Sequence, residues 1–191
     1  VVQSVSRLLR LPVPTTVSAS SDGQVLQMWE LLNEEVADLA SFHPWQALTT
    51  EYSFTTVNAE QQPSGLPADL DRWLPDSFFN RSTRRPLTGP IDPQQWQAIK
   101  AYPYLSTVYL MWRERQGAFY ITPAPPAGQS IYGEYISNSP IRSFGGALQT
   151  TYQNDADYSV LSEQLMGLGL RWRFLKAKGL EYGEDKNSYE S

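Results

Sequence analysis

Residues 157–179, DYSVLSEQLMGLGLRWRFLKAKG, predict a long helix around which the rest of the chain is organised. Its apolar residues step by four, three, four and three, which places them on one helical face: Leu161, Leu165, Leu168, Trp172 and Leu175. We expect this face to be buried. Asp155 or Asp157 would cap the first turn, and Gly179 would end the helix after several basic residues.

Two glycines lie inside this predicted helix. Gly167 and Gly169 each cost roughly 1 kcal/mol against alanine in an exposed helix. Close approach of a neighbouring backbone would explain their presence. We interpret the segment as a packed interior helix rather than as a ligand site.

Composition indicates one mixed domain. The chain has 191 residues, 41% hydrophobic and 18% charged, which is enough for one sizeable core. An aromatic content of 13% with 14 prolines favours a lobe of strands and loops beside the helices, hence an α+β fold. The net charge of -5 argues against a cationic surface for nucleic acid or membrane.

The residue inventory excludes several kinds of site. Without cysteine the chain has no disulfide, thiolate metal site or cysteine nucleophile, and its single histidine, His43, excludes a histidine-rich metal site. No apolar run approaches the roughly 20 residues that span a bilayer, and the start lacks the pattern of a signal peptide. We therefore expect a soluble protein made in a cytoplasm.

Three further helices are predicted. Residues 1–10 have helical apolar spacing, and residues 21–42 follow a capping-box pattern that starts at Ser21. Asp92 followed by proline begins a short helix that carries Trp96 and Ile99. Helices from both chain ends, in 1–45 and 155–179, are expected to form a bundle, with residues 46–150 as a β-rich insertion.

Several segments of the insertion alternate apolar and polar residues, which is typical of strands. Residues from 48 to 55 alternate as a half-buried strand, and 60–67 is a loop by composition. Residues 106–113 and 118–122 predict a hairpin, to which 130–137 would add the third strand of an antiparallel meander. Residues 180–191 contain too few apolar side chains to fold alone, so we expect a flexible tail.

No catalytic motif is present. The chain has no nucleophile elbow, zinc-binding HExxH helix or phosphate loop, so we assign neither catalytic nor metal-binding residues. Glu51, Asp69 and Asp71 are the carboxylates that an acid/base reaction on a sugar bond would use. Surface carboxylates are the favoured interpretation, because nothing in the sequence indicates a perturbed pKa.

One basic cluster stands out in an acidic chain: Arg72, Arg81, Arg84 and Arg85. These side chains could bind phosphate. We prefer pairing with acidic residues of neighbouring loops or of a neighbouring copy, because no aromatic-interleaved basic groove accompanies them.

Several motifs together resemble the head-to-tail adaptor, or connector, family of tailed bacteriophages. The resemblance covers nearly the whole chain, and its most specific parts are the block from LPADLDRW to TRRPLTGP, the GEYIS strand and the KGL-x-Y ending. It implies a helical bundle with a β-rich insertion, no cofactor, and a homo-oligomeric ring of twelve copies under the portal.

The resemblance also implies partners and sites. The ring would extend the DNA channel, with DNA passing through without specific binding, and would attach a downstream tail or nozzle protein in the virion neck. Leu180, Tyr182 and Tyr189, in the C-terminal extension, would bind the portal protein. Independently of the resemblance, the opposite sign of the arginine cluster and the acidic helix faces predicts that Arg81, Arg84 and Arg85 lie at subunit interfaces. The alternative is a tail accessory protein with peptidoglycan hydrolase activity. A tail-tube protein would be β-rich throughout, which the helical ends oppose.

Overall fold

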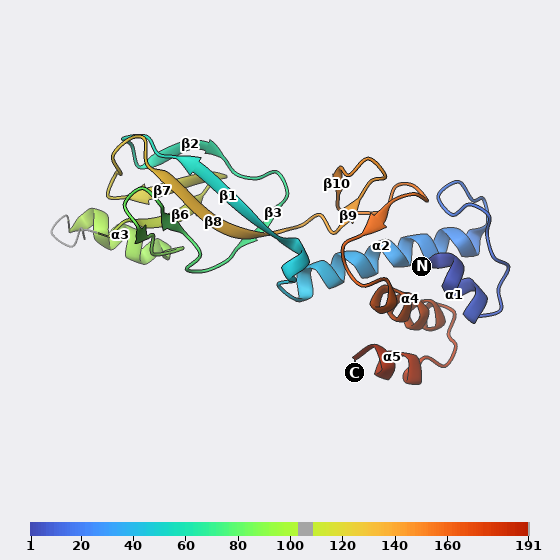
Figure 1. Cartoon of the computed structure of the whole chain (residues 1–191). Coiled ribbons are helices and arrows are strands. Elements are labelled where there is room, and N and C mark those ends of the chain that lie inside the picture. The colour runs from blue at the N-terminus through green and yellow to red at the C-terminus, as the bar shows by residue number, and fades with distance from the viewer. Residues whose placement is uncertain (103–108, 191) are drawn as a thin grey trace. The chain divides into compact units, whose positions relative to one another are not determined.

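The computed structural model describes residues 1–102 and 109–190 and divides the chain into two compact units (Figure 1). The terminal unit comprises Val1–Leu48 and Asn138–Ser191, and the central unit comprises Thr49–Ser137. Helices and antiparallel sheets are both present, so the α+β class predicted from composition is confirmed. The compact central unit is shorter at both ends than the insertion 46–150 drawn from the sequence.

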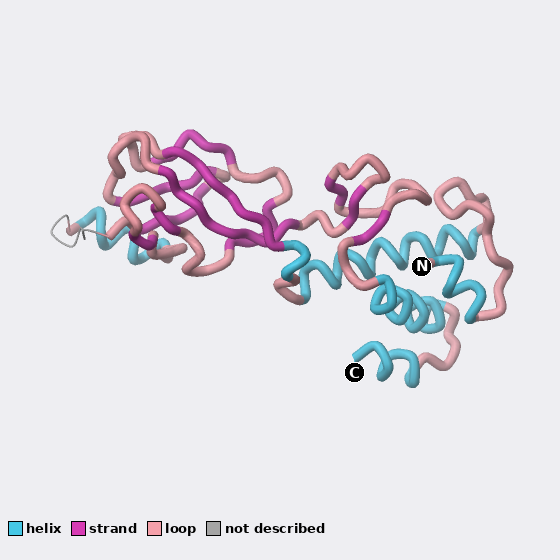
Figure 2. The backbone as a smooth tube through the Cα atoms, in the orientation of Figure 1, coloured by secondary structure: helices cyan, strands magenta, loops and turns pink. Residues whose placement is uncertain are grey.

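Helices dominate the terminal unit (Figure 2). It contains α1 (Val2–Leu8), α2 (Gly23–Phe42), α4 (Glu163–Ala177) and α5 (Gly183–Glu190), and α4 contacts each of the other three. A small sheet has the order β10-β9-β11, formed by Leu148–Gln149, Ile141–Arg142 and Tyr158–Ser159. The 140–152 segment therefore supplies two of these short strands.

Helix α2 follows the predicted periodicity. Asp22, rather than Ser21, caps it by accepting a hydrogen bond from the Gln24 amide at 2.7 Å. The apolar side chains recur at helical spacing, and those that are buried are Val25, Met28, Leu32, Val36 and Leu39.

Helix α4 corrects two predictions. Its N-cap is Ser162, because Asp155 accepts from the amides of Val17 and Ser18 and Asp157 accepts from those of Gln153 and Asn154. Its buried helical residues are Met166, Gly169, Leu170 and Phe174, whereas the residues predicted from Leu165 to Leu175 are only half-buried. The predicted face was wrong because α4 has neighbours on several sides, so burial does not follow one apolar stripe.

The central unit is built from two antiparallel sheets. The larger has the order β1-β8-β4-β5, with β3 also on β8, and the smaller has the order β2-β7-β6. The strands of the larger sheet are β1 (Thr49–Thr55), β3 (Leu70–Trp73), β4 (Phe79–Asn80), β5 (Arg85–Pro86) and β8 (Ser130–Ser137). The smaller sheet contains β2 (Gln61–Gly65), β6 (Met111–Arg115) and β7 (Ala118–Thr122).

Helix α3 (Pro93–Ala101) begins as predicted, with the Asp92 carboxylate accepting from the Gln95 amide at 2.7 Å. Its Trp96 and Ile99 pack with Met111 and Ile91 in a small apolar cluster. The proline at the first helical position needs no amide partner there, which explains why the helix starts at this residue.

Aromatic rings form the core of the central unit. Trp112 and Phe119 stack with their centroids 4.8 Å apart, and Phe78 lies 4.6 Å from Trp112. Gly133 of β8 makes room for Phe78, since a Cβ at this position would come within 2.5 Å of the phenylalanine ring. Both Phe78 and Trp112 are fully buried.

The strand pairing differs from the predicted meander. Strand β8 pairs with β1, β3 and β4, so it is not the third strand beside the β6–β7 hairpin. That position belongs to β2, within the segment predicted to be a loop. Pro63 is tolerated there because the pairing shifts register between Gln61 and Gly65. The predicted hairpin itself is confirmed from Met111 onward, and residues 106–108 lie outside the described part of the chain.

Candidate interaction surface

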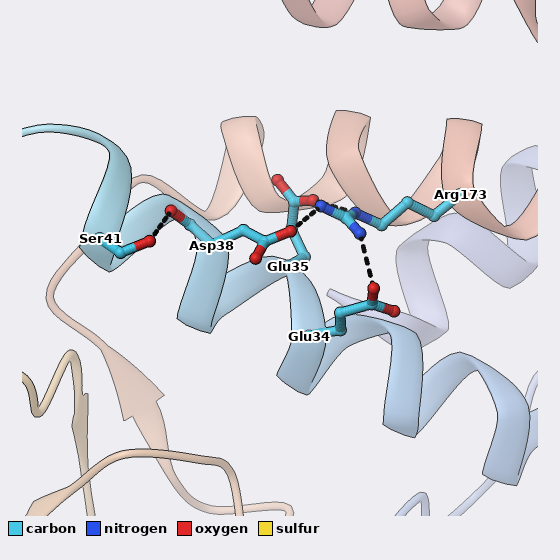
Figure 3. A network of polar contacts seen from close by, with 5 residues as sticks. All are labelled: Glu34, Glu35, Asp38, Ser41 and Arg173. Carbon is cyan, nitrogen blue, oxygen red and sulfur yellow. Dashed lines mark hydrogen bonds and ion pairs between the residues drawn. The ribbon is translucent and has the colours of Figure 1, made fainter.

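The strongest polar cluster of the terminal unit surrounds Arg173 (Figure 3). From α4, its guanidinium forms ion pairs with three carboxylates of α2: Glu34 at 3.2 Å, Glu35 at 2.5 Å and Asp38 at 2.5 Å. The Glu35 side chain is completely buried, and that of Arg173 is 14% exposed. Burial alone would lower the pKa of Arg173, but the hydrogen bonds that its guanidinium donates to Glu35 and Asp38 raise it. The cluster therefore fixes α4 against α2 electrostatically.

Gly169 allows helix α4 to lie close to the carboxylate of Glu35. A Cβ on Gly169 would overlap the carboxylate of Glu35, whereas a Cβ on Gly167 would meet no atom within 4 Å. The neighbour that requires Gly169 is thus a side chain, not the backbone expected from the sequence. At Gly167 the expectation of a close neighbour is wrong.

Residues 180–191 were expected to be a flexible tail, but the structure places a helix there. Helix α5 packs on α4: the Trp172 ring centroid lies 6.4 Å from that of Tyr182 and 6.2 Å from that of Tyr189. Arg171 and Asp185 add an ion pair at 3.0 Å. Burial raises the pKa of the Tyr189 hydroxyl, and the nearby Glu35 carboxylate raises it further. Two of the three predicted portal-binding residues therefore contact their own helical unit, while Leu180 is exposed.

A groove lies beside the Arg173 cluster, at the end of α2. Its volume is about 700 Å³, and its apolar lining consists of Leu39, Phe42, Trp45 and Leu165. Phe42 is 87% exposed. Trp45 is held in place because its indole N–H donates to the Leu39 carbonyl at 2.6 Å. His43 follows the helix, and its ring meets that of Trp45 edge-on with the centroids 5.2 Å apart.

The β9–β10 hairpin of the same unit exposes a second aromatic side chain. Phe144, at its tip, is 86% exposed. The tip is held by a Ser143 N–H···O=C Ala147 bond of 2.9 Å and by the Ala147 amide, which donates to the Ser143 hydroxyl at 3.0 Å. Gly146 closes the turn with a φ of 85°, a value that favours glycine. Neither Phe144 nor the groove was predicted from the sequence. An aromatic residue between serine and two glycines does indicate a turn that carries an aromatic side chain at its tip.

The arginine cluster does not act as one group. Arg81 pairs with Glu51 at 2.6 Å and lies over the Tyr132 ring at 3.5 Å, and Arg72 pairs with Asp71 at 3.3 Å. Arg81 thus pairs with an acid of another segment, whereas Arg72 pairs with its own sequence neighbour in β3. Arg84 and Arg85 are exposed in the β4–β5 turn and strand.

The three carboxylates weighed for acid/base catalysis all have partners in the central unit. Glu51 and Asp71 form the ion pairs just described. Asp69 accepts hydrogen bonds from the Tyr135 hydroxyl at 2.9 Å and the Ser137 hydroxyl at 2.7 Å. Burial and the Asp69 carboxylate raise the pKa of Tyr135 to about 12. These contacts give each carboxylate a structural role.

Within residues 1–102 and 109–190, no group of three or more His, Asp or Glu side chains is arranged to hold a metal ion. No helix in this part of the chain combines the length and apolar character needed to cross a bilayer.

No protein-family model matches the chain, and no curated protein matches it either.

Proposed function

We propose that this chain is a structural head-to-tail adaptor of a tailed-phage virion, forming a ring under the portal that extends the DNA channel. The observation that supports this most is the chain's division: residues 49–137 form their own unit between two segments whose helices pack together. The motif resemblance implies this arrangement, a bundle of terminal helices with a β-rich insertion.

The surface chemistry agrees with an assembly role. Phe42 and Phe144 are the most exposed large apolar side chains in the described residues. Exposed aromatic residues of this kind are frequent anchors of protein interfaces. In the ring, Arg84 and Arg85 contact acidic helix faces of the next subunit, while Arg81 remains bound to Glu51 beside that interface.

The net charge of -5 suits a channel for DNA. Each cation that neutralises a phosphate adds binding, so an acidic lining lets DNA pass. The proposed partners are the portal protein, further copies of the chain, and a downstream tail or nozzle protein.

In this proposal Leu180, Tyr182 and Tyr189 contact the portal. Leu180 is 56% exposed and follows directly on α4, so it is available to a partner while α5 is packed. The tyrosines are half-buried at the edge of α4, where a partner can cover their remaining surface.

The decisive experiment mixes the full chain with the portal protein of the same phage and images the complex by negative-stain electron microscopy. We expect a ring of adaptor density on one end of the portal. Deletion of residues 181–191 removes α5, so it should lower the helical circular-dichroism signal by that helix alone, keep a cooperative thermal transition, and reduce portal binding in a pull-down. If the full chain neither binds the portal nor forms a ring on it, the adaptor function is wrong.

A further inference from the structure

We propose that Phe144 of one copy inserts into the groove formed by Leu39, Phe42, Trp45 and Leu165 of a second copy. This inference rests on the proposed adaptor function, and it names the residues that join neighbouring subunits. The observations that carry it are the shape, exposure and placement of two apolar features of the terminal unit.

Phe144 and the groove of the same chain cannot contact each other. In Figure 1 the strands β9 and β10 lie on one side of α2, and α4 and α5 lie on the other. The groove is lined from α2, α4 and α5, whereas Phe144 extends from the β9–β10 turn. A contact between them therefore requires two molecules.

The hairpin is suited to insertion. Its tip is held by the bonds between Ser143 and Ala147 and by the Gly146 amide, which donates to the Ser143 carbonyl at 2.8 Å. A preformed loop loses little conformational entropy on binding, so most of the apolar contact contributes to affinity. A phenylalanine ring exposed on such a loop has the character of an interface anchor.

The groove is suited to receive it. A volume of about 700 Å³ accommodates an aromatic side chain with part of its flanking backbone. The Trp45 indole is already oriented by its bond to the Leu39 carbonyl, and Phe42 offers an exposed ring for edge-to-face contact. Asp38, Arg173 and Glu190 also line the groove. Asp38 is already paired with Arg173, so the phenylalanine ring would pack on the four apolar side chains beside an existing ion pair.

The adaptor ring requires this contact to be heterologous, with Phe144 of each copy in the groove of one neighbour and its own groove filled by the other neighbour. Such a contact propagates from copy to copy and closes into a ring when the rotation fits. The same contact made reciprocally between two copies would give a symmetric dimer, in which cross-linking of the double cysteine variant would stop at the covalent dimer.

Cysteine cross-linking tests the pairing directly, because the chain contains no cysteine. Two single variants, Phe42→Cys and Phe144→Cys, are prepared separately, and both residues are exposed enough for folding to be preserved. Under mild oxidation, with and without portal protein, a mixture of the two should give a disulfide-linked dimer of the chain. Each variant alone should give far less of this product. The double variant should give a covalent ladder.

Sedimentation velocity on the uncrosslinked chain supplies the second measurement. Phe144→Ala should weaken self-association by about tenfold or more, as expected for an interface anchor. Leu26→Ala, which removes an exposed apolar side chain elsewhere on α2, should change it little.

The outcomes separate this inference from the adaptor function. Assembly that persists without the mixed cross-link would overturn the Phe144 contact but leave the adaptor function standing. Cross-linking of Phe42→Cys with itself, or with portal protein instead of the chain, would assign the groove a different occupant and also refute the inference. Absence of both self-association and portal binding would refute the two proposals together.

Discussion

Gly169 determines how closely α4 can approach the carboxylate of Glu35. Alanine at this position would force the carboxylate away from its pairing with Arg173, so Gly169→Ala should lower the free energy of unfolding by about 1–3 kcal/mol. Gly167→Ala is the matched control. It has open space around the added methyl group and should raise stability by about 0.5–1 kcal/mol, since alanine is the better helix former. Urea denaturation measures both, and equal effects of the two substitutions would contradict this account.

The Asp155 carboxylate ties the segment after α1 to the segment before α4. It accepts from the Ser18 amide at 2.7 Å and the Val17 amide at 3.0 Å, and these bonds lower its pKa. A lowered pKa in the folded state means that the stabilisation is complete above the unfolded value of about 3.9. It is lost as pH falls through the folded-state pKa.

Asp155→Asn should therefore destabilise the protein at pH 7, and its effect should shrink as the pH is lowered through the folded-state pKa of the wild-type carboxylate. The measurement is the urea midpoint of both proteins at each pH. Glu30→Gln, at an exposed position of α2, serves as a control for general charge effects. A difference between wild type and variant that does not change with pH would exclude the carboxylate as its source.

At the level of elements, α5 is held by few contacts. It has no fully buried residue and depends on Tyr182 and Tyr189 against Trp172 and on the Arg171–Asp185 pair. Replacing both tyrosines with alanine should free α5 while α4 remains folded. Hydrogen exchange should then accelerate in residues 183–190 but not in 163–177. Replacing them with phenylalanine keeps the rings and should preserve protection, and equal exchange in both double variants would show that the rings do not hold α5.

The sequence predicts some elements well because their signals are local. Amphipathic spacing and capping residues identify α2 and α3 to within a residue or two at their ends. Strand β2 was missed because Pro63 and polar neighbours mask its pairing with β7. Helix α5 was missed because its composition is polar and its support comes from Trp172.

The Arg173 cluster and the groove were harder to predict from the sequence. Arg173 and Glu35 are separated by 138 positions in the chain, and no local pattern connects them. Gly169 gave a partial signal, since a costly glycine in a helix indicates a close neighbour but not its identity. The groove depends on where Leu165 packs relative to Phe42, which only the folded chain defines.

At the scale of the whole molecule, the central unit has its own aromatic core and two sheets. We expect residues 49–137 to fold cooperatively when expressed alone, with a sharp thermal transition and near-ultraviolet circular dichroism from the packed rings. Phe78→Ala should cost about 3–5 kcal/mol in this fragment, because its ring is fully buried against Trp112 and Phe119. Phe79→Ala, at a more exposed neighbouring position, should cost much less. A fragment without a cooperative transition would show that the terminal unit is needed.

The division of the terminal unit between two segments also sets an order for events on the ribosome. Helix α2 is synthesised before the whole of residues 49–137, whereas α4, its packing partner, is synthesised after them. The ribosome extends the chain from the end of α2 at Phe42 to the end of α4 at Ala177 at roughly 5–20 residues per second, so this interval lasts on the order of 7–27 s. During that time the apolar face of α2, including Met28, Leu32 and Val36, has no α4 to cover it. Nascent chains paused in this interval are therefore expected to bind chaperones, and slower translation would lengthen their exposure to aggregation.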